Sequence, residues 1–323
     1  MIFEKQIVNL YKGKMHRRCD DTETVFYFGP EHFDGLNAEP YSFTASAGHT
    51  LRGYIYGYEN PIENRIVVFD HGFGGGHRAY MKEIEMLCRH GYLVLSYDHT
   101  GCMSSGGESS GGFAQSLCDL NDCIAAIKAD PRFEGYDISV MGHSWGAFST
   151  LNITALHPEI SHIVAMCGYV TVEEMVDTFL NGPLKLYRKA IMRVENQTNP
   201  AFAKFNAADT LASSSTKALL VYSEDDHLCQ RKHYDILRAK LDGKENISFM
   251  FTTNNKRHNP NYTEDAVKLL AVFSKERAEL LRRKKVTGKE KAEFVASFDW
   301  DRMTAQDESV WTEIFAHLDD TAE

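Results

Sequence analysis

The sequence predicts an α/β fold in which a mostly parallel sheet is covered by helices on both faces. Short, near-continuous apolar runs recur along the chain, as expected for strands that are buried on both sides. Stretches with apolar residues at helical spacing lie between them, and this alternation favours parallel strands joined by right-handed crossovers. The apolar runs are 65–69, 92–96, 138–141, 162–166, 218–222 and 247–251.

A β-hairpin is expected ahead of the first of these runs. Residues 41–45 and 51–58 alternate between apolar and polar side chains, and Gly48 lies between them. The forty residues at the N-terminus are rich in aromatic side chains but show no regular pattern. We therefore expect eight strands and an irregular N-terminal segment.

Helices are expected where apolar residues follow a spacing of three or four. Residues 80–89 and 113–129 show such stripes between predicted strands. A long helix is expected from about Thr263 to the basic run 282–285, because cations suit the C-terminal end of a helix. Residues 307–318 have the same apolar spacing, which predicts a docking helix in the C-terminal tail.

One connection is longer than the fold requires. Residues 171–216 separate two consecutive strands by 46 residues, roughly twice what a plain crossover needs, and they include many apolar side chains. We expect a small helical lid there. Its candidate substrate-binding residues are Met175, Phe179 and Tyr187.

A serine nucleophile is expected after the run 138–141. The pattern Gly-x-Ser-x-Gly occurs at 142–146, where a strand enters and a plausible helix leaves, as a nucleophile elbow requires. The same pattern occurs at 107–111 around Ser109, but that serine lies in a Gly/Ser-rich loop with no strand before it. Context therefore selects Ser144.

With these motifs the chain resembles the α/β-hydrolase superfamily of serine hydrolases. The second matching motif is His-Gly-Phe-Gly-Gly at 71–75, after the run 65–69, and the resemblance covers about residues 41–285. It implies an eight-stranded, mostly parallel sheet with a helical lid between the sixth and seventh strands. It also implies a catalytic triad in the chain order Ser, acid, His.

The acid of the triad is expected where the run 218–222 ends. Three acids, Glu224, Asp225 and Asp226, are contiguous there. The superfamily pattern resembles Gly-x-x-Asp with Ser223 in the glycine position, and this alignment favours Asp226, with Asp225 and then Glu224 as alternatives.

The base is expected at His258. It follows the last predicted strand and precedes the final helix of the core, where the superfamily carries its histidine. The two other histidines after Asp226 in the core are less suitable as the base, because His227 directly follows the acid and His233 lies in a predicted helix. The resemblance also implies an oxyanion hole formed by the backbone N–H groups of Phe73 and Trp145.

These residues predict a hydrolase that cleaves a carboxylic ester of a small or medium acyl substrate through an acyl-enzyme. A peptidase, amidase or thioesterase of the same fold is the alternative, and a non-hydrolytic binding protein is the least favoured. No cofactor is expected. No metal is expected either, because the clustered histidines His71, His77, His99 and His143 match no zinc-binding spacing.

Composition limits the remaining possibilities. The 323 residues carry a formal net charge of −10, which argues against nucleic-acid or anionic-membrane partners. The seven cysteines form no CxxC pair, and the sequence shows neither a signal peptide nor a long apolar run, so a cytoplasmic protein is expected. We expect one domain over 1–285, with its core from about residue 41, and a tail over 286–323. Oligomeric state is not indicated.

Overall fold

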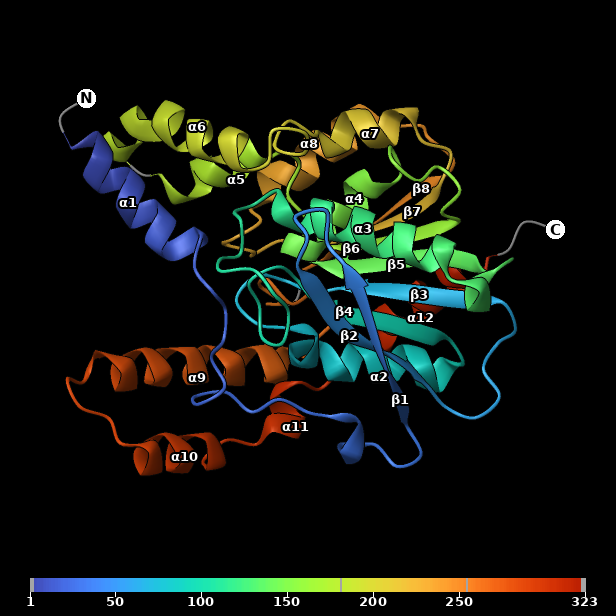
Figure 1. Cartoon of the computed structure of the whole chain (residues 1–323), viewed down its shortest axis with the longest axis horizontal. Coiled ribbons are helices and arrows are strands. Elements are labelled where there is room, and N and C mark those ends of the chain that lie inside the picture. Colours follow the sequence, from blue (N-terminus) through green and yellow to red (C-terminus); the bar gives the residue numbers. More distant parts are fainter. Residues whose placement is uncertain (1–2, 181, 254, 321–323) are drawn as a thin grey trace.

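The computed structural model describes residues 3–180, 182–253 and 255–320. Its centre is one eight-stranded sheet in the order β1-β2-β4-β3-β5-β6-β7-β8 (Figure 1). Strand β2 runs antiparallel to both of its neighbours, β1 and β4, and the pairings from β4 to β8 are all parallel. The fold class expected from the sequence is confirmed. The strands are β1 Asn37–Thr44, β2 Thr50–Gly57, β3 Arg65–Asp70, β4 Leu93–Asp98, β5 Asp137–His143, β6 His162–Met166, β7 Lys217–Ser223 and β8 Ile247–Thr252.

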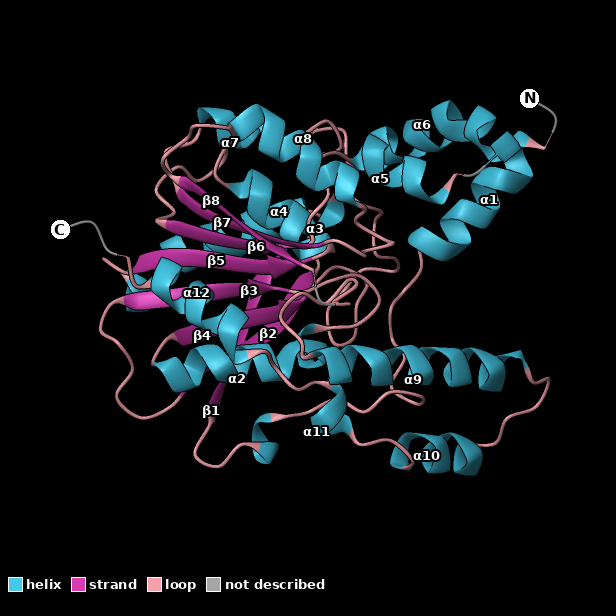
Figure 2. Ribbon diagram, turned by 180° about the vertical axis from the view of Figure 1, so that it is seen from behind, coloured by secondary structure: helices cyan, strands magenta, loops and turns pink. Residues whose placement is uncertain are grey.

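Two helical layers bury the sheet on its opposite faces (Figure 2). This double burial explains why the central strands are near-continuous apolar runs rather than alternating ones. One layer comprises α3 Gln115–Ala129, α4 Trp145–Ile153, α7 Ala207–Ser213 and α8 Arg231–Leu241. The other face is covered by α2 Met81–His90 and α12 Glu308–Leu318. Helix α9 Glu264–Arg282 lies on the same side of the sheet as α2, in the lower part of Figure 2.

The N-terminal segment is not irregular as expected, because residues Glu4–Met15 form helix α1. Ile7, Tyr11 and Met15 lie on one stripe at a spacing of four and pack against the main core. Figures 1 and 2 both place α1 beside helix α6, far from the sheet. The helix is stabilised by the lid rather than by the sheet, which is why the strand pattern gave no hint of it.

The long connection after β6 divides into two parts. Helices α5 Val172–Phe179, η4 Gly182–Tyr187 and α6 Arg188–Thr198 project beyond the sheet, and Thr171 caps α5 by accepting the N–H of Glu174. Helix α7 instead packs beside α4 and α8. The projecting part, from α5 to α6, is therefore shorter than the range 171–216, and its role as a lid stays a prediction. Residue 181, within that range, is outside the described residues.

The C-terminal tail is helical and returns to the sheet. After α9 the chain forms α10 Gly288–Ala296 and α11 Trp300–Met303 before α12. Helix α12 buries Val310, Trp311, Ile314 and Leu318 against the same face as α2. Residues 321–323 of the expected tail are outside the described part. Among the helices described, none combines the length and apolar character needed to cross a bilayer.

Candidate active site

Ser144 lies at the tight turn between β5 and α4. Its backbone has φ 57° and ψ −110°, a conformation that L-residues rarely adopt. The N–H of Ser144 donates to Met166 O at 2.9 Å, and Phe148 N donates back to Ser144 O at 3.1 Å. These bonds hold the turn so that the serine side chain projects from the carboxyl end of the sheet.

Both glycines of the motif are required by close backbone contacts. A Cβ on Gly142 would lie 2.4 Å from Gly146 O, and a Cβ on Gly146 would lie 2.0 Å from Asp70 O. No side chain fits at either distance, so helix α4 can approach β3 and β5 only with glycine at both positions. Ser109 lies outside any such turn, and its Oγ accepts the N–H of Gly111 at 3.3 Å.

The structure brings Ser144, His258 and Asp226 together in one hydrogen-bonded line. His258 Nε2 lies 2.8 Å from Ser144 Oγ, and His258 Nδ1 lies 2.7 Å from Asp226 Oδ2. The Asp226 carboxylate can only accept, so Nδ1 carries the proton and Nε2 presents its lone pair to the serine hydroxyl. This is the arrangement in which a histidine can remove the serine proton.

Asp226, rather than its two acidic neighbours, faces the histidine. Its Oδ1 also accepts the N–H groups of Leu228 and Cys229 at 2.7 and 3.0 Å. Burial opposes ionisation, but hydrogen bonding and the charge of His258 outweigh it and hold the pKa of Asp226 below its ordinary value. Asp225 instead accepts the backbone N–H of Arg257 at 2.8 Å. Glu224 is exposed.

The expected oxyanion donors, Phe73 and Trp145, both line the cavity that contains Ser144. Neither of their backbone N–H groups donates to another group within the described residues. Their side chains contact each other edge to face, with ring centroids 5.2 Å apart. Trp145 is further anchored by its indole N–H, which donates to Phe113 O at 2.9 Å.

The cavity at Ser144 is small and mostly apolar. Its volume is about 170 Å³, close to the roughly 150 Å³ of an engineered protein cavity that binds benzene. Two expected lid residues, Met175 and Phe179, line it, whereas Tyr187 does not. Met15 of α1 also lines it, which the sequence did not suggest. The remaining side chains in the wall include Tyr80, Phe113, His143, Tyr169 and Leu228.

A buried ion cluster supports the floor of the site. His99 lies between two fully buried carboxylates, with Nε2 3.0 Å from Asp70 and Nδ1 3.2 Å from Asp119. Burial alone would lower the pKa of His99, but the two carboxylates outweigh it and raise the pKa to about 10. The His99 ring packs 4.7 Å from that of Trp145. The charged histidine therefore stabilises the position of an expected oxyanion residue.

Among the described residues, one group has three potential metal-ligating atoms in close proximity, namely Cys167, Asp226 and His258. Both ring nitrogens of His258 are already engaged, by Ser144 and by Asp226. Burial and the adjacent carboxylate raise the pKa of the Cys167 thiol, which favours its neutral form. A cysteine binds a metal as the thiolate. The three residues are therefore better suited to hydrogen bonding with one another than to binding a metal ion.

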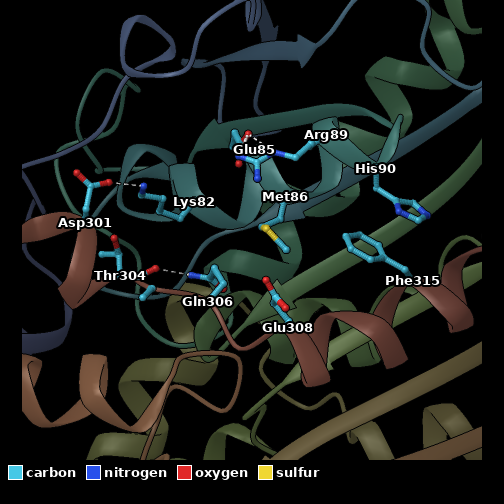
Figure 3. A pocket seen from close by; sticks show the side chains of 11 residues that line it. Lys82, Glu85, Met86, Arg89, His90, Asp301, Thr304, Gln306, Glu308 and Phe315 are labelled. Atoms are coloured by element: carbon cyan, nitrogen blue, oxygen red, sulfur yellow. Dashed lines mark hydrogen bonds and ion pairs between the residues drawn. The ribbon is translucent and has the colours of Figure 1, made fainter.

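A second, larger cavity of about 480 Å³ lies between α2 and the tail, away from Ser144 (Figure 3). Two ion pairs lie in its wall, one between Lys82 and Asp301 and one between Arg89 and Glu85, both at 2.5 Å. His90 stacks on Phe315 with ring centroids 3.9 Å apart. The pair of Lys82 with Asp301 and the stacking of His90 on Phe315 join the tail to α2 and indicate a structural interface.

The fold and the site define an α/β-hydrolase of the serine hydrolase type. The chain belongs to the Hydrolase_4 family, described as serine aminopeptidase, S33, which matches residues 62–248, more than half of the chain. An uncharacterized protein of Bacillus subtilis, YqkD, is 21% identical over 257 residues, which span 77% of this chain and 81% of that protein.

Solved structures agree on the fold. The Pyrococcus furiosus esterase Pf2001 is similar with a TM-score of 0.59 at 18% identity, over 82% of this chain and 98% of that one. A putative dipeptidyl aminopeptidase IV from Bacteroides ovatus has a TM-score of 0.53 at 15% identity, over 76% of this chain and 36% of that one. The similar structures thus include an esterase and a peptidase.

Proposed function

We propose that this hydrolase cleaves carboxylic esters of short or single-ring acyl groups through a Ser144–His258–Asp226 triad. The observation that carries the proposal is the hydrogen-bonded line from Ser144 Oγ through His258 to Asp226, at 2.8 and 2.7 Å, at the edge of a small apolar cavity. In this reaction His258 takes the serine proton as Oγ attacks the ester carbonyl. The resulting oxyanion is stabilised by the N–H groups of Phe73 and Trp145.

The second half of the reaction uses the same residues. His258, then protonated and held by Asp226, gives its proton to the departing alcohol, and an acyl group stays on Ser144. Water enters, His258 removes its proton, and the acyl-enzyme is hydrolysed. The loss of one oxyanion donor costs about 3 kcal/mol in related chemistry, so both N–H groups matter for the rate.

The charge of the lid favours an ester over an aminopeptidase substrate. An aminopeptidase needs a free carboxylate to bind the substrate amine, and the four lid acids are all engaged. Glu173 and Asp177 pair with Arg188, and Glu174 pairs with Lys232. Glu195 is fully buried and accepts hydrogen bonds from Tyr11, His16 and the backbone of Phe113.

The test is covalent labelling with a fluorophosphonate probe, followed by turnover of p-nitrophenyl esters, aminoacyl amides and acyl thioesters. We expect the wild-type protein to label and to prefer the esters. Ser144→Ala should lose both labelling and turnover, and Ser109→Ala, the matched control, should keep both. Unchanged labelling of Ser144→Ala would contradict the assigned nucleophile, and a preference for the amides would replace the esterase proposal with a peptidase.

A further inference from the structure

His143, between Gly142 and the nucleophile, connects two parts of the site that the triad does not link. Its side chain is buried, and its ring centroid lies 4.7 Å from that of His258. Nε2 of His143 lies 2.6 Å from the backbone carbonyl oxygen of His258, and Nδ1 lies 2.9 Å from the hydroxyl of Tyr80. Both ring nitrogens are therefore engaged.

The chemistry of these partners fixes every donor. A carbonyl oxygen can only accept, so Nε2 of His143 must carry the proton. Nδ1 of the neutral ring then presents a lone pair, and the hydroxyl of Tyr80 must donate to it. The Tyr80 oxygen rests against the loop after β3, since a Cβ on Gly72 would lie 2.3 Å from it. One chain of contacts thus runs from the oxyanion loop through the nucleophile elbow to the loop of the base.

The loop that carries His258 needs such support. Asn255 and Arg257 both have left-handed backbones, with φ of 51° and 49°. Left-handed backbones in residues other than glycine cost free energy and persist only where surrounding contacts enforce them. Asp225 holds the N–H of Arg257 on one side of His258, and His143 holds the carbonyl of His258 itself.

We propose that His143 and Tyr80 are positioning residues that hold the backbone of His258, so that Nε2 of His258 stays in line with Ser144 Oγ. The proposal rests on the proposed esterase function. It assigns neither residue a bond to substrate. The hydroxyl of Tyr80 sets the tautomer of His143, and the N–H of His143 restrains the base.

The ring of His143 has to be neutral to do this beside a base that becomes positively charged. Burial, and then the charge of His258, lower the pKa of His143 to about 3. Tyr80 donates a hydrogen bond as a neutral phenol, because burial raises its pKa. A neutral donor restrains the carbonyl of His258 without repelling the imidazolium that forms during the reaction.

Three variants test the proposal on p-nitrophenyl butyrate. His143→Leu removes the donor, His143→Gln retains a side-chain N–H, and Tyr80→Phe removes only the hydroxyl. Because misplacement of a catalytic group by about 1 Å can cost on the order of 100-fold, we expect kcat of His143→Leu to fall by roughly 10- to 100-fold with KM within about twofold. The rate of fluorophosphonate labelling should fall by the same factor. His143→Gln should recover most of the lost kcat. The kcat of Tyr80→Phe should lie between those of His143→Leu and His143→Gln.

The matched control is His162→Leu, at the opposite end of the sheet. His162 is also a buried histidine bonded to a backbone carbonyl, that of Asp320 at 2.9 Å, and its loss should leave kcat unchanged. Turnover of His143→Leu within threefold of wild type, or no recovery by glutamine, would overturn the positioning role. Near-ultraviolet circular dichroism shows whether His143→Leu is misfolded. If it is, the kcat and labelling rate of Tyr80→Phe test the positioning role in its place. If the wild-type protein does not label, the esterase proposal is overturned, and the positioning proposal for His143 and Tyr80 falls with it.

Discussion

At the scale of single residues, the site depends on a serine held in a backbone conformation that few residues adopt. The positive φ of Ser144 costs on the order of 1–3 kcal/mol. It persists because Gly142 and Gly146 let α4 pack directly on the strands, where any side chain would clash. This requirement is local, but the same five-residue pattern also surrounds Ser109, so the strand ahead of Ser144 was needed to select it as the candidate nucleophile. The acid was harder to predict, since three acids are contiguous; the superfamily pattern favoured Asp226, and the structure places its carboxylate against His258.

Asparagine substitutions separate the two aspartates of this turn. Asp226→Asn should lower kcat by roughly 1,000- to 10,000-fold, because the amide no longer favours the tautomer of His258 that accepts the serine proton. Asp225→Asn should retain kcat within about fivefold, since its Oδ1 can still accept the N–H of Arg257. Steady-state turnover of a p-nitrophenyl ester measures both. A larger loss in Asp225→Asn than in Asp226→Asn would exchange their roles.

At the scale of elements, the sequence predicted the strands of the sheet but missed helix α1, which packs against the projecting helix α6. The strands were found because burial on both faces makes them apolar throughout, as in β3 and β5. Helix α1 has a single buried residue, Tyr11, and its partner Glu195 is 184 positions away. A contact between two peripheral helices so far apart leaves little signal in either segment. The stripe of Ile7, Tyr11 and Met15 was the one available indication.

Helix α1 gives an experimental handle on acyl-chain length, because Met15 lines the cavity. Met15→Ala should enlarge the cavity and admit longer chains. Each buried methylene is worth up to about 0.8 kcal/mol, or roughly fourfold in kcat/KM. We therefore expect the ratio of kcat/KM for p-nitrophenyl hexanoate to that for the butyrate to rise by roughly four- to tenfold.

Leu10→Ala is the control for this change, since Leu10 lies on the same helix but its side chain is 59% exposed. It should leave the hexanoate-to-butyrate ratio as in the wild type. An unchanged ratio in Met15→Ala, or an equal rise in Leu10→Ala, would show that α1 does not limit the acyl group.

At the scale of the whole molecule, the tail is joined to the loop that carries His258, the proposed base. Asn261, three residues after His258, donates to Gln306 of the tail at 2.8 Å and to Glu83 of α2 at 3.1 Å. Its carbonyl accepts the N–H of Asp307 at 2.7 Å. The sequence predicted the tail helix from apolar spacing, but these polar contacts join segments far apart in the chain and could not be foreseen. The tail therefore stabilises one side of the site.

Glu83, at the centre of this junction, should make folding stability depend on pH. Burial raises its pKa from the ordinary 4.5 to about 7, and hydrogen bonds, including one from Asn261, only partly oppose this. Folding thus favours the protonated carboxyl. The protonated Glu83 contributes fully to the free energy of unfolding below pH 4.5. This contribution, about 3 kcal/mol, is lost as the pH rises through about 7.

Removing the titrating group should remove this pH dependence. Between pH 5.0 and 8.5 the unfolding free energy of the wild type should fall by roughly 2–3 kcal/mol more than that of Glu83→Gln. Urea unfolding of both proteins at both pH values measures the difference, and other titrating groups cancel because they are common to the two. Equal pH dependence in wild type and variant would mean that Glu83 is ionised in the folded protein at no cost.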